Sequence, residues 1–339
     1  MSHELTETES GTYEMAYVGE TPWHGLGQVL QPGASIEDWQ QAAGMNWSIR
    51  RGDMQYFADR ACTDLRLVPD QKVLFRGDTG AKLGIVSNEY QIVQPSEVLE
   101  FFRDLVATQG FQLETAGTMF GGSRYWALAK VTKAVISGWD EIGGYCLIST
   151  TADGSRATEI RKTTVRVVCN NTLSMALSLD SKEVIRITHR QRFDSERVQQ
   201  QMGLSLEEFD SFIEVAHALS KIRVTKAAAD DFVTRLLRKA GRTVQAVQDD
   251  EDEDQLDSDT KQRKPRGLEI ITSLFEGQGH GATKQGSAGT AWGLVNAVTE
   301  YVDHLSSAKT VSHRLDRAFF GSGDVLKTLA LQRALVELV

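Results

Sequence analysis

Basic side chains are concentrated in a strand-like segment at residues 156–166. These eleven residues include four bases opposed only by Glu159, namely Arg156, Arg161, Lys162 and Arg166. Strand alternation places Lys162 and Arg166 on one face and Arg161 on the other, with threonines on both faces. Guanidinium and hydroxyl groups donate hydrogen bonds to phosphate oxygens, so an exposed strand of this composition predicts a nucleic-acid contact. A solvated strand held by cross-strand ion pairs is the alternative interpretation.

A second group of bases follows further along the chain, with Arg186, Arg190 and Arg192 surrounding His189. Across residues 151–192 there are eight Lys and Arg against four Asp and Glu. A local excess of base in an acidic chain favours an anionic partner. We therefore include Arg186 and Arg190 in the predicted nucleic-acid-binding surface.

Two adjacent asparagines, Asn170 and Asn171, lie between these groups and precede an apolar run. This arrangement predicts the N-cap of a short helix. A helix N-terminus can also hold an anion, so Asn170 and Asn171 join the predicted surface, with a phosphate held between them and Arg166. Helix capping alone explains the same residues.

A different kind of site is suggested by residues at the two ends of the chain. Trp23 and His24 lie in a Gly-rich loop, and Asn296, Glu300 and His304 share one face of a predicted C-terminal helix. Glu300 and His304, four residues apart, could share a metal ion or a proton. These residues define an alternative pocket. Because no second His lies nearby, we expect no metal, and a structural loop and a hydrogen-bonded helix face remain alternatives.

The common catalytic motifs do not occur in this sequence. The segment GATKQGS at 281–287 has phosphate-loop glycine spacing but lacks the Lys and Ser/Thr pair after its second glycine. HExxH, CxxC, GxSxG and a strand-linked GxGxxG are also missing. The sequence thus gives no support to common ATPase, zinc-hydrolase or dinucleotide chemistry. We expect no cofactor and no catalytic residue, with enzyme activity an open but less favoured alternative.

Charge in this 339-residue chain is distributed unevenly, and its length indicates about two domains. The formal net charge is −9, but residues 249–259 carry eight acids and no base. Without that run the net charge is about −1, so bulk charge neither favours nor opposes a phosphate partner. An apolar content of 41% allows a core of ordinary size.

Cysteine usage and the N-terminus predict a cytoplasmic protein. The three cysteines, Cys62, Cys146 and Cys169, lie far apart, which is typical of reduced thiols. The N-terminal MSHELTETES has no apolar signal-peptide core, and no apolar run approaches the roughly 20 residues of a membrane span. We expect no membrane partner.

Apolar periodicity predicts an α+β fold. Alternating segments between Gly and Asp turns at 45–87 and 111–151 predict a mixed or antiparallel sheet, and 3.6-residue spacing at 96–109 predicts a helix packed on it. Helical spacing dominates after residue 194. The predicted organisation is a flexible N-terminus at 1–12, an α+β domain at 13–194, a helical segment at 195–244, a disordered acidic and basic linker at 245–266, and a helical C-terminal region at 267–339.

Four segments resemble a known family. These are MAYVGETPWHGLG at 15–27, RVVCNNTLSMAL at 166–177, GTAWGLVNAVTEYVDH at 289–304 and FFGSGDVLK at 319–327. Together they resemble the phage/plasmid-like protein family, domain of unknown function 932. Where that family usually has a His-Asp-Gly-Ser turn, this chain has Ala152 in place of the histidine. The resemblance implies a protein of a phage, prophage or plasmid acting in the bacterial cytoplasm, and it implies no particular activity.

Two functional hypotheses follow from these residues. The leading one is a nucleic-acid-binding protein of phage or plasmid DNA metabolism, such as an ATP-independent single-strand annealing or recombination accessory. Single-stranded DNA is the favoured partner, and homo-oligomer formation is an open question. The alternative is a counter-defence factor or enzyme that uses the Trp23/His24 loop together with Glu300 and His304. A continuous positive groove favours the first, and a closed pocket favours the second.

Overall fold

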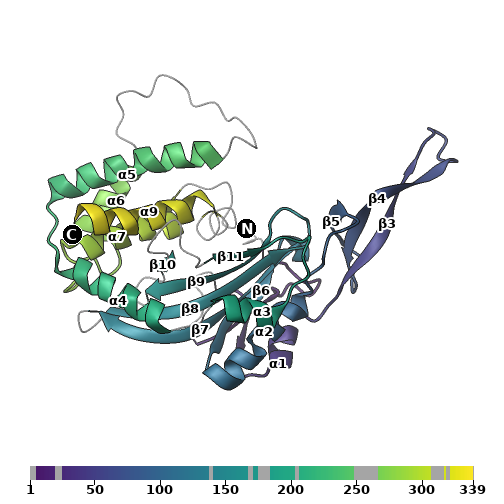
Figure 1. The fold of residues 1–339 in the computed structure, drawn as a ribbon, viewed down its shortest axis with the longest axis horizontal. Helices are drawn as coiled ribbons and strands as arrows, with labels where there is room; N and C mark the ends of the chain where they lie inside the picture. The colour runs from purple at the N-terminus through teal and green to yellow at the C-terminus, as the bar shows by residue number, and fades with distance from the viewer. Residues whose placement is uncertain are drawn as a thin grey trace. The chain divides into compact units, whose positions relative to one another are not determined.

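The computed structural model describes residues 5–19, 25–136, 140–166, 171–174, 184–202, 206–247, 266–306, 317 and 321–338. The chain divides into two compact units. The first consists of Met1–Thr132, Tyr145–Lys162 and Lys182–Leu204, and the second of Lys133–Gly144, Thr163–Ser181 and Ser205–Val339. Sheet predominates in the first unit and helix in the second, so the predicted α+β class is confirmed (Figure 1).

Most of the described strands belong to one sheet with the order β10-β9-β8-β7-β6-β1-β2, and β11 also pairs with β9. Its strands are β1 (Met15–Val18), β2 (Gln28–Leu30), β6 (Gln112–Met119), β7 (Arg124–Ile136), β8 (Asp140–Thr151), β9 (Thr158–Arg166), β10 (Asn171–Ser174) and β11 (Val184–Ile187). The β1–β6, β6–β7, β9–β10 and β9–β11 pairs are antiparallel, whereas β1 and β2 are parallel. The predicted mixed sheet is therefore present.

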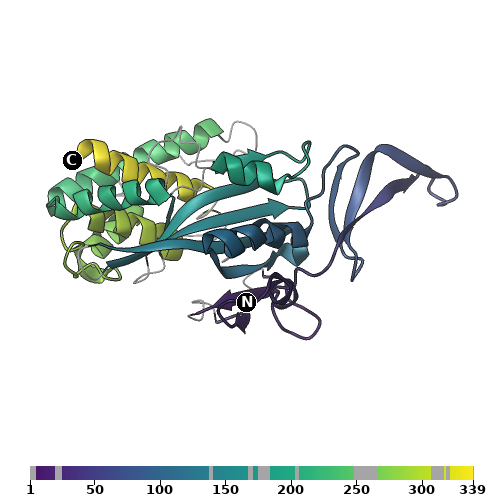
Figure 2. The same ribbon diagram turned by 60° about the horizontal axis from the view of Figure 1, so that its bottom comes forward.

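A smaller sheet in the first unit has the order β3-β4-β5, from β3 (Ile49–Phe57), β4 (Leu65–Arg76) and β5 (Lys82–Ser87). Strand β5 pairs only with the Gln71–Phe75 part of β4. The outer half of the β3–β4 hairpin is thus a two-stranded ribbon. Figures 1 and 2 show this ribbon extending away from α1 and α2 of the same unit.

The core of the first unit forms where two helices meet the sheet. Helix α1 (Ile36–Ala42) begins after Ser35, whose hydroxyl accepts the Asp38 amide. Helix α2 (Pro95–Gln109) starts with a proline and ends at left-handed Gly110, a combination that stops a helix cleanly. Short η1 (Phe120–Gly122) joins β6 to β7, and α3 (Ser195–Met202) follows β11.

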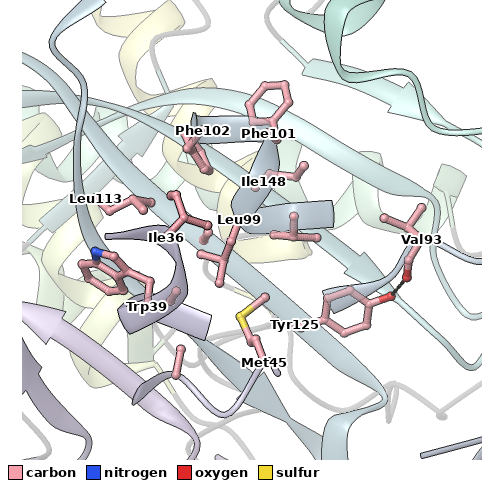
Figure 3. Close-up of a cluster of buried hydrophobic side chains, with 14 of the residues drawn as sticks. Ile36, Trp39, Met45, Val93, Leu99, Phe101, Phe102, Leu113, Tyr125 and Ile148 are labelled. Carbon is pink, nitrogen blue, oxygen red and sulfur yellow. Dashed lines mark hydrogen bonds between the residues drawn. The ribbon is translucent and has the colours of Figure 1, made fainter. Parts of the chain in front are cut away.

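Large apolar side chains from α1, α2 and the sheet fill this core (Figure 3). Trp39 of α1, Phe101 and Phe102 of α2, and Tyr125 of β7 are all buried. The Tyr125 hydroxyl donates to the Val93 carbonyl. This bond satisfies the one polar atom of the Tyr125 side chain, which lies inside an apolar cluster. Helix α2 is thereby fixed on the sheet, as its apolar spacing predicts.

The second unit is mainly helical. Its helices are α4 (Leu206–Lys221), α5 (Lys226–Val247), α6 (Arg266–Ser273), η2 (Leu274–Gln278), α7 (Ala291–Glu300), η3 (Tyr301–Leu305) and α9 (Ser322–Glu337). Helix α7 is buried along its whole length and contacts α4, α6 and α9. Its Gly293 is required, because a Cβ atom there would lie 2.0 Å from the Ser287 carbonyl oxygen.

Three sequence predictions differ from the structure. The side chains of residues 158–164 of β9 are buried on both faces of the strand, so the predicted exposed face is wrong. Asn171 begins strand β10 instead of a helix, since its backbone pairs with Arg166 of β9. Helix α5 continues through Val247, beyond the predicted linker start at 245, and residues 248–265 lie outside the described residues.

Candidate nucleic-acid interface

Exposed arginines gather in a groove between β11 and α3 of the first unit. The groove has a volume of about 940 Å³ and is lined by residues 185–187 and 191–198. We call it the arginine groove after three of its lining residues, Arg186, Arg192 and Arg197, all of which are exposed. Arg190 is exposed on the turn that leads into it. Asp194 and Glu196 also line the groove, so its positive charge is moderate.

Helix α3 forms one wall of the groove and is anchored on the core. Val198 is buried in the apolar cluster, Phe193 packs 6.2 Å from the Phe101 ring, and Gln199 donates to the Phe101 carbonyl at 2.9 Å. Asp194 caps the helix by accepting the Arg197 amide at 3.1 Å. The wall that carries Arg197 is therefore held before any ligand arrives.

Strand β11 forms the opposite wall and is aligned by a buried carboxylate. Register places Arg186 opposite Glu159 of β9, and the Arg186 Nε donates to Glu159 at 2.9 Å. Buried Arg161 donates to the other oxygen of Glu159, also at 2.9 Å. Burial alone would raise the pKa of Glu159, but Arg161 and Arg186 lower it. Since 63% of the Arg186 side chain is exposed, its guanidinium remains accessible from the groove.

The turn between β11 and α3 is fixed by His189. Its ring stacks on Tyr90 at 4.3 Å and lies between two carbonyl oxygens, Gln91 at 3.0 Å from Nδ1 and Arg156 at 3.1 Å from Nε2. A neutral ring donates to only one of them, whereas a cation would donate to both. Burial nevertheless lowers the pKa of His189, which favours the neutral ring. The histidine thus positions the neighbouring arginines while remaining buried itself.

The predicted nucleic-acid residues separate into exposed and buried sets. Arg186 and Arg190 are exposed, whereas Arg161 and Lys162 are buried in β9 and cannot reach a ligand in this conformation. Arg156 is half-buried in the β8–β9 turn. Arg166 and Asn171 lie in strands whose side chains are outside the described residues, as is all of Asn170.

The alternative-pocket residues make contacts within α7 and with the loop before it. Both oxygens of buried Glu300 accept the His280 amide, and one lies 2.7 Å from the His280 Nδ1. The Asn296 amide donates to the Trp292 carbonyl one turn earlier. His304 is half-buried in η3, and Trp23 and His24 lie outside the described residues. The described ranges contain no group of three His, Cys, Asp or Glu side chains placed to hold a metal ion.

Arg197 is the groove residue that sequence reasoning missed. A signal for it exists, because Asp194 and Ser195 form an N-cap pattern and Arg197 follows in the first turn of the helix. Arg192 belongs to the second basic group, but its place beside Arg197 depends on the turn at residues 188–191. The sequence shows where the basic residues occur along the chain, whereas the fold determines which of them line the same groove.

Comparisons with known proteins identify a family without a described activity. The family model described as "Domain of unknown function (DUF932)" matches residues 82–319. Neither the curated proteins nor the solved structures contain a significant match. No helix in the described ranges has the length and apolar character needed to cross a bilayer.

Proposed function

Because the chain belongs to the DUF932 family, whose description gives no activity, we propose its function from the arginine groove: it binds nucleic acid through backbone phosphates. The observation that carries this proposal is that Arg186, Arg192 and Arg197 line one groove together. Planar guanidinium groups match phosphate oxygens bidentately, and exposed ones need no rearrangement of the core to bind.

Single-stranded DNA is the partner that we favour. The groove contains Phe193, but this ring packs against Phe101, so extensive base stacking is not expected there. Recognition in the groove would therefore rely on the charged backbone, which is one of the two elements of sequence-independent single-strand binding, base stacking being the other. A role in ATP-independent annealing or recombination for a phage or plasmid, in the host cytoplasm, is the biological setting that we propose from the family resemblance.

The test is a binding titration of the full chain against labelled single-stranded DNA, double-stranded DNA and RNA at several salt concentrations. Each phosphate contact to a single strand contributes a slope of roughly −0.7 in log K against log salt. The variant Arg186→Ala/Arg192→Ala/Arg197→Ala should flatten the slope by about two units if all three side chains engage.

A charge-matched control is Lys221→Ala/Arg238→Ala/Lys239→Ala, which removes three exposed bases from the second unit. This control should leave the salt slope of the wild type unchanged. Absence of binding by folded wild-type protein, or equal slopes for the two triple variants, would remove the proposal. If the groove variant loses binding, an annealing assay with complementary strands and no ATP then tests the biological role.

A further inference from the structure

The three-stranded part of the β3-β4-β5 sheet has one face on the core and one face outside it. The core face carries buried apolar side chains, namely Ile49, Leu74 and Val86. We call the other side the open face, and its apolar side chains are Val73, Phe75 and Ile85. In the described ranges these three belong to none of the apolar core clusters. The solvated face of an antiparallel sheet usually carries polar residues, so apolar ones there indicate a contact surface.

Phe75 is the aromatic ring of the open face. It is half-buried, and within the part of the chain that the structure describes no other ring contacts it and no base lies over it. Gly52 leaves the ring room to lean across β3, since a Cβ atom there would lie 3.2 Å from the Phe75 Cε1. A ring that leans along a sheet turns a flat apolar surface outward. Phe193 of the arginine groove differs, because its ring packs against Phe101.

The bases beside Phe75 indicate an anionic partner. Register places Arg50 of β3 and Lys82 of β5 on either side of Phe75. Both are exposed, and neither makes an ion pair or a hydrogen bond with another described residue. The bases of the core face are all engaged by carbonyls or carboxylates of the protein, namely Arg51, Lys72 and Arg76. The register positions of the open face hold no Asp or Glu, so its positive charge is uncompensated and attracts an anion.

A short segment sets this sheet beside the arginine groove in the first unit. Residues 88–91 follow β5, and the Tyr90 ring stacks at 4.3 Å on His189, in the turn that leads into the groove. The Arg51 guanidinium of β3 donates to the Asn88 and Tyr90 carbonyls, and the Gln91 amide donates to the His189 carbonyl. A nucleic-acid strand long enough to leave the groove therefore reaches the sheet.

We propose that the open face is a stacking platform for the bases of the single strand whose phosphates the arginine groove holds, with Phe75 as the stacking ring. This inference rests on the proposed function, because the groove supplies the backbone contacts and Phe75 supplies the base contact. An aromatic ring on a sheet face, within a positively charged surface, is a common way of binding unpaired bases. Stacking requires a base but no charge, whereas a phosphate contact requires charge but no base, so the two contributions can be measured separately.

Titrations of the full chain with a single strand of about 15 nucleotides, and with an abasic strand of the same length, test the inference. Wild-type protein should bind the strand with bases at least roughly fivefold more tightly, the lower limit for one stacked base. Phe75→Leu should remove most of this preference and leave the salt slope unchanged, because it removes a ring and no charge. Phe57→Leu, at an exposed ring beyond the register shift of the same hairpin, is the matched control and should keep the preference.

The outcomes separate this inference from the groove proposal, with circular dichroism confirming that each variant is folded. Equal binding of both strands by wild type, or a preference that Phe75→Leu retains, would overturn the stacking platform and leave the groove proposal to its own salt slopes. Equal weakening on both strands by Phe75→Leu would assign Phe75 to the fold and also overturn it. Loss of the preference in Phe75→Leu alone, with a slope that the groove triple variant leaves unchanged, would support the open face and remove the groove. Wild-type protein that binds neither strand would remove both.

Discussion

Removing one partner of the buried ion pair between Arg76 and Glu14 should destabilise the first unit strongly. Arg76, at the end of β4, donates to both oxygens of Glu14 at 3.0 and 2.7 Å, and it also pairs with Asp78 at 2.8 Å. Its guanidinium lies 4.1 Å from the Trp47 ring. Thr118 of β6 donates to Glu14 as well. This cluster joins the base of the hairpin to β1 and β6 of the main sheet.

The expected magnitude follows from burial. Both side chains of the pair are buried, so Arg76→Met leaves the Glu14 carboxylate in the interior without its cation. Such a change typically costs about 3–5 kcal/mol. Asp78 is exposed enough to be solvated after the change and should add little. A loss of about 4 kcal/mol corresponds to a decrease in Tm of roughly 8–16 °C for a unit of 150–250 residues.

Urea denaturation followed by circular dichroism measures the free energy of unfolding, with hydrogen exchange at β1 and β4 as a local readout. Arg66→Met on the same strand is the matched control, since its pair with Asp64 is exposed and should contribute about 0–1 kcal/mol. Glu14→Leu/Arg76→Met should reduce the free energy of unfolding by less than Arg76→Met alone, because the double variant also removes the buried carboxylate that would otherwise lack a cation. Equal costs for Arg76→Met and Arg66→Met would refute this reasoning.

Three further variants test other features of the first unit. In the unfolded chain His189 has a pKa near 6.5, and burial lowers its pKa in the folded protein. The free energy of unfolding should therefore decrease as the pH falls below about 6.5. In urea titrations, the difference in that free energy between wild type and His189→Gln should shrink from pH 7.5 to pH 5.5. Arg161→Ala should reduce Tm by several degrees, because it strips buried Glu159 of one partner, and an unchanged Tm would contradict its burial. Gly84→Ala should destabilise the unit, since its Cβ would lie 2.5 Å from the Asp153 Cα, and an unfolding midpoint equal to wild type would count against that close approach.

Local sequence patterns predicted helix α2 of the first unit, and they also account for α1. Helix α1 has Ser35 as its cap, and α2 has a proline start, a glycine end and apolar spacing that matches its buried face. These signals are local, because capping and 3.6-residue periodicity act within one element. The hairpin strands were predicted for the same reason, as glycine and aspartate turns separate their alternating residues.

Burial of charged strands could not be predicted in the same way. Arg161 and Lys162 have the composition of an exposed strand, and only the folded structure shows that both side chains are buried. The adjacent Asn170 and Asn171 have the composition of a helix cap, but Asn171 instead pairs in the sheet with Arg166. In both cases tertiary structure overrides a local preference. Strand pairing satisfies the backbone of Asn171, and packing on the faces of β9 buries Arg161 and Lys162.

The division between buried and exposed bases sets a quantitative limit on nucleic-acid binding. If all eight Lys and Arg of residues 151–192 contacted phosphates, the slope of log K against log salt would be about −5.6. The structure leaves the arginine groove and Arg190 as the exposed cluster of the first unit that we assign to binding, and four contacts give about −2.8. A measured wild-type slope near the smaller value, together with insensitivity of that slope to Arg161→Ala in a folded sample, would match a backbone contact confined to the groove. A slope near the larger value would mean that β9 opens to the ligand or that bases elsewhere take part, and the groove alone would then be an insufficient account of binding.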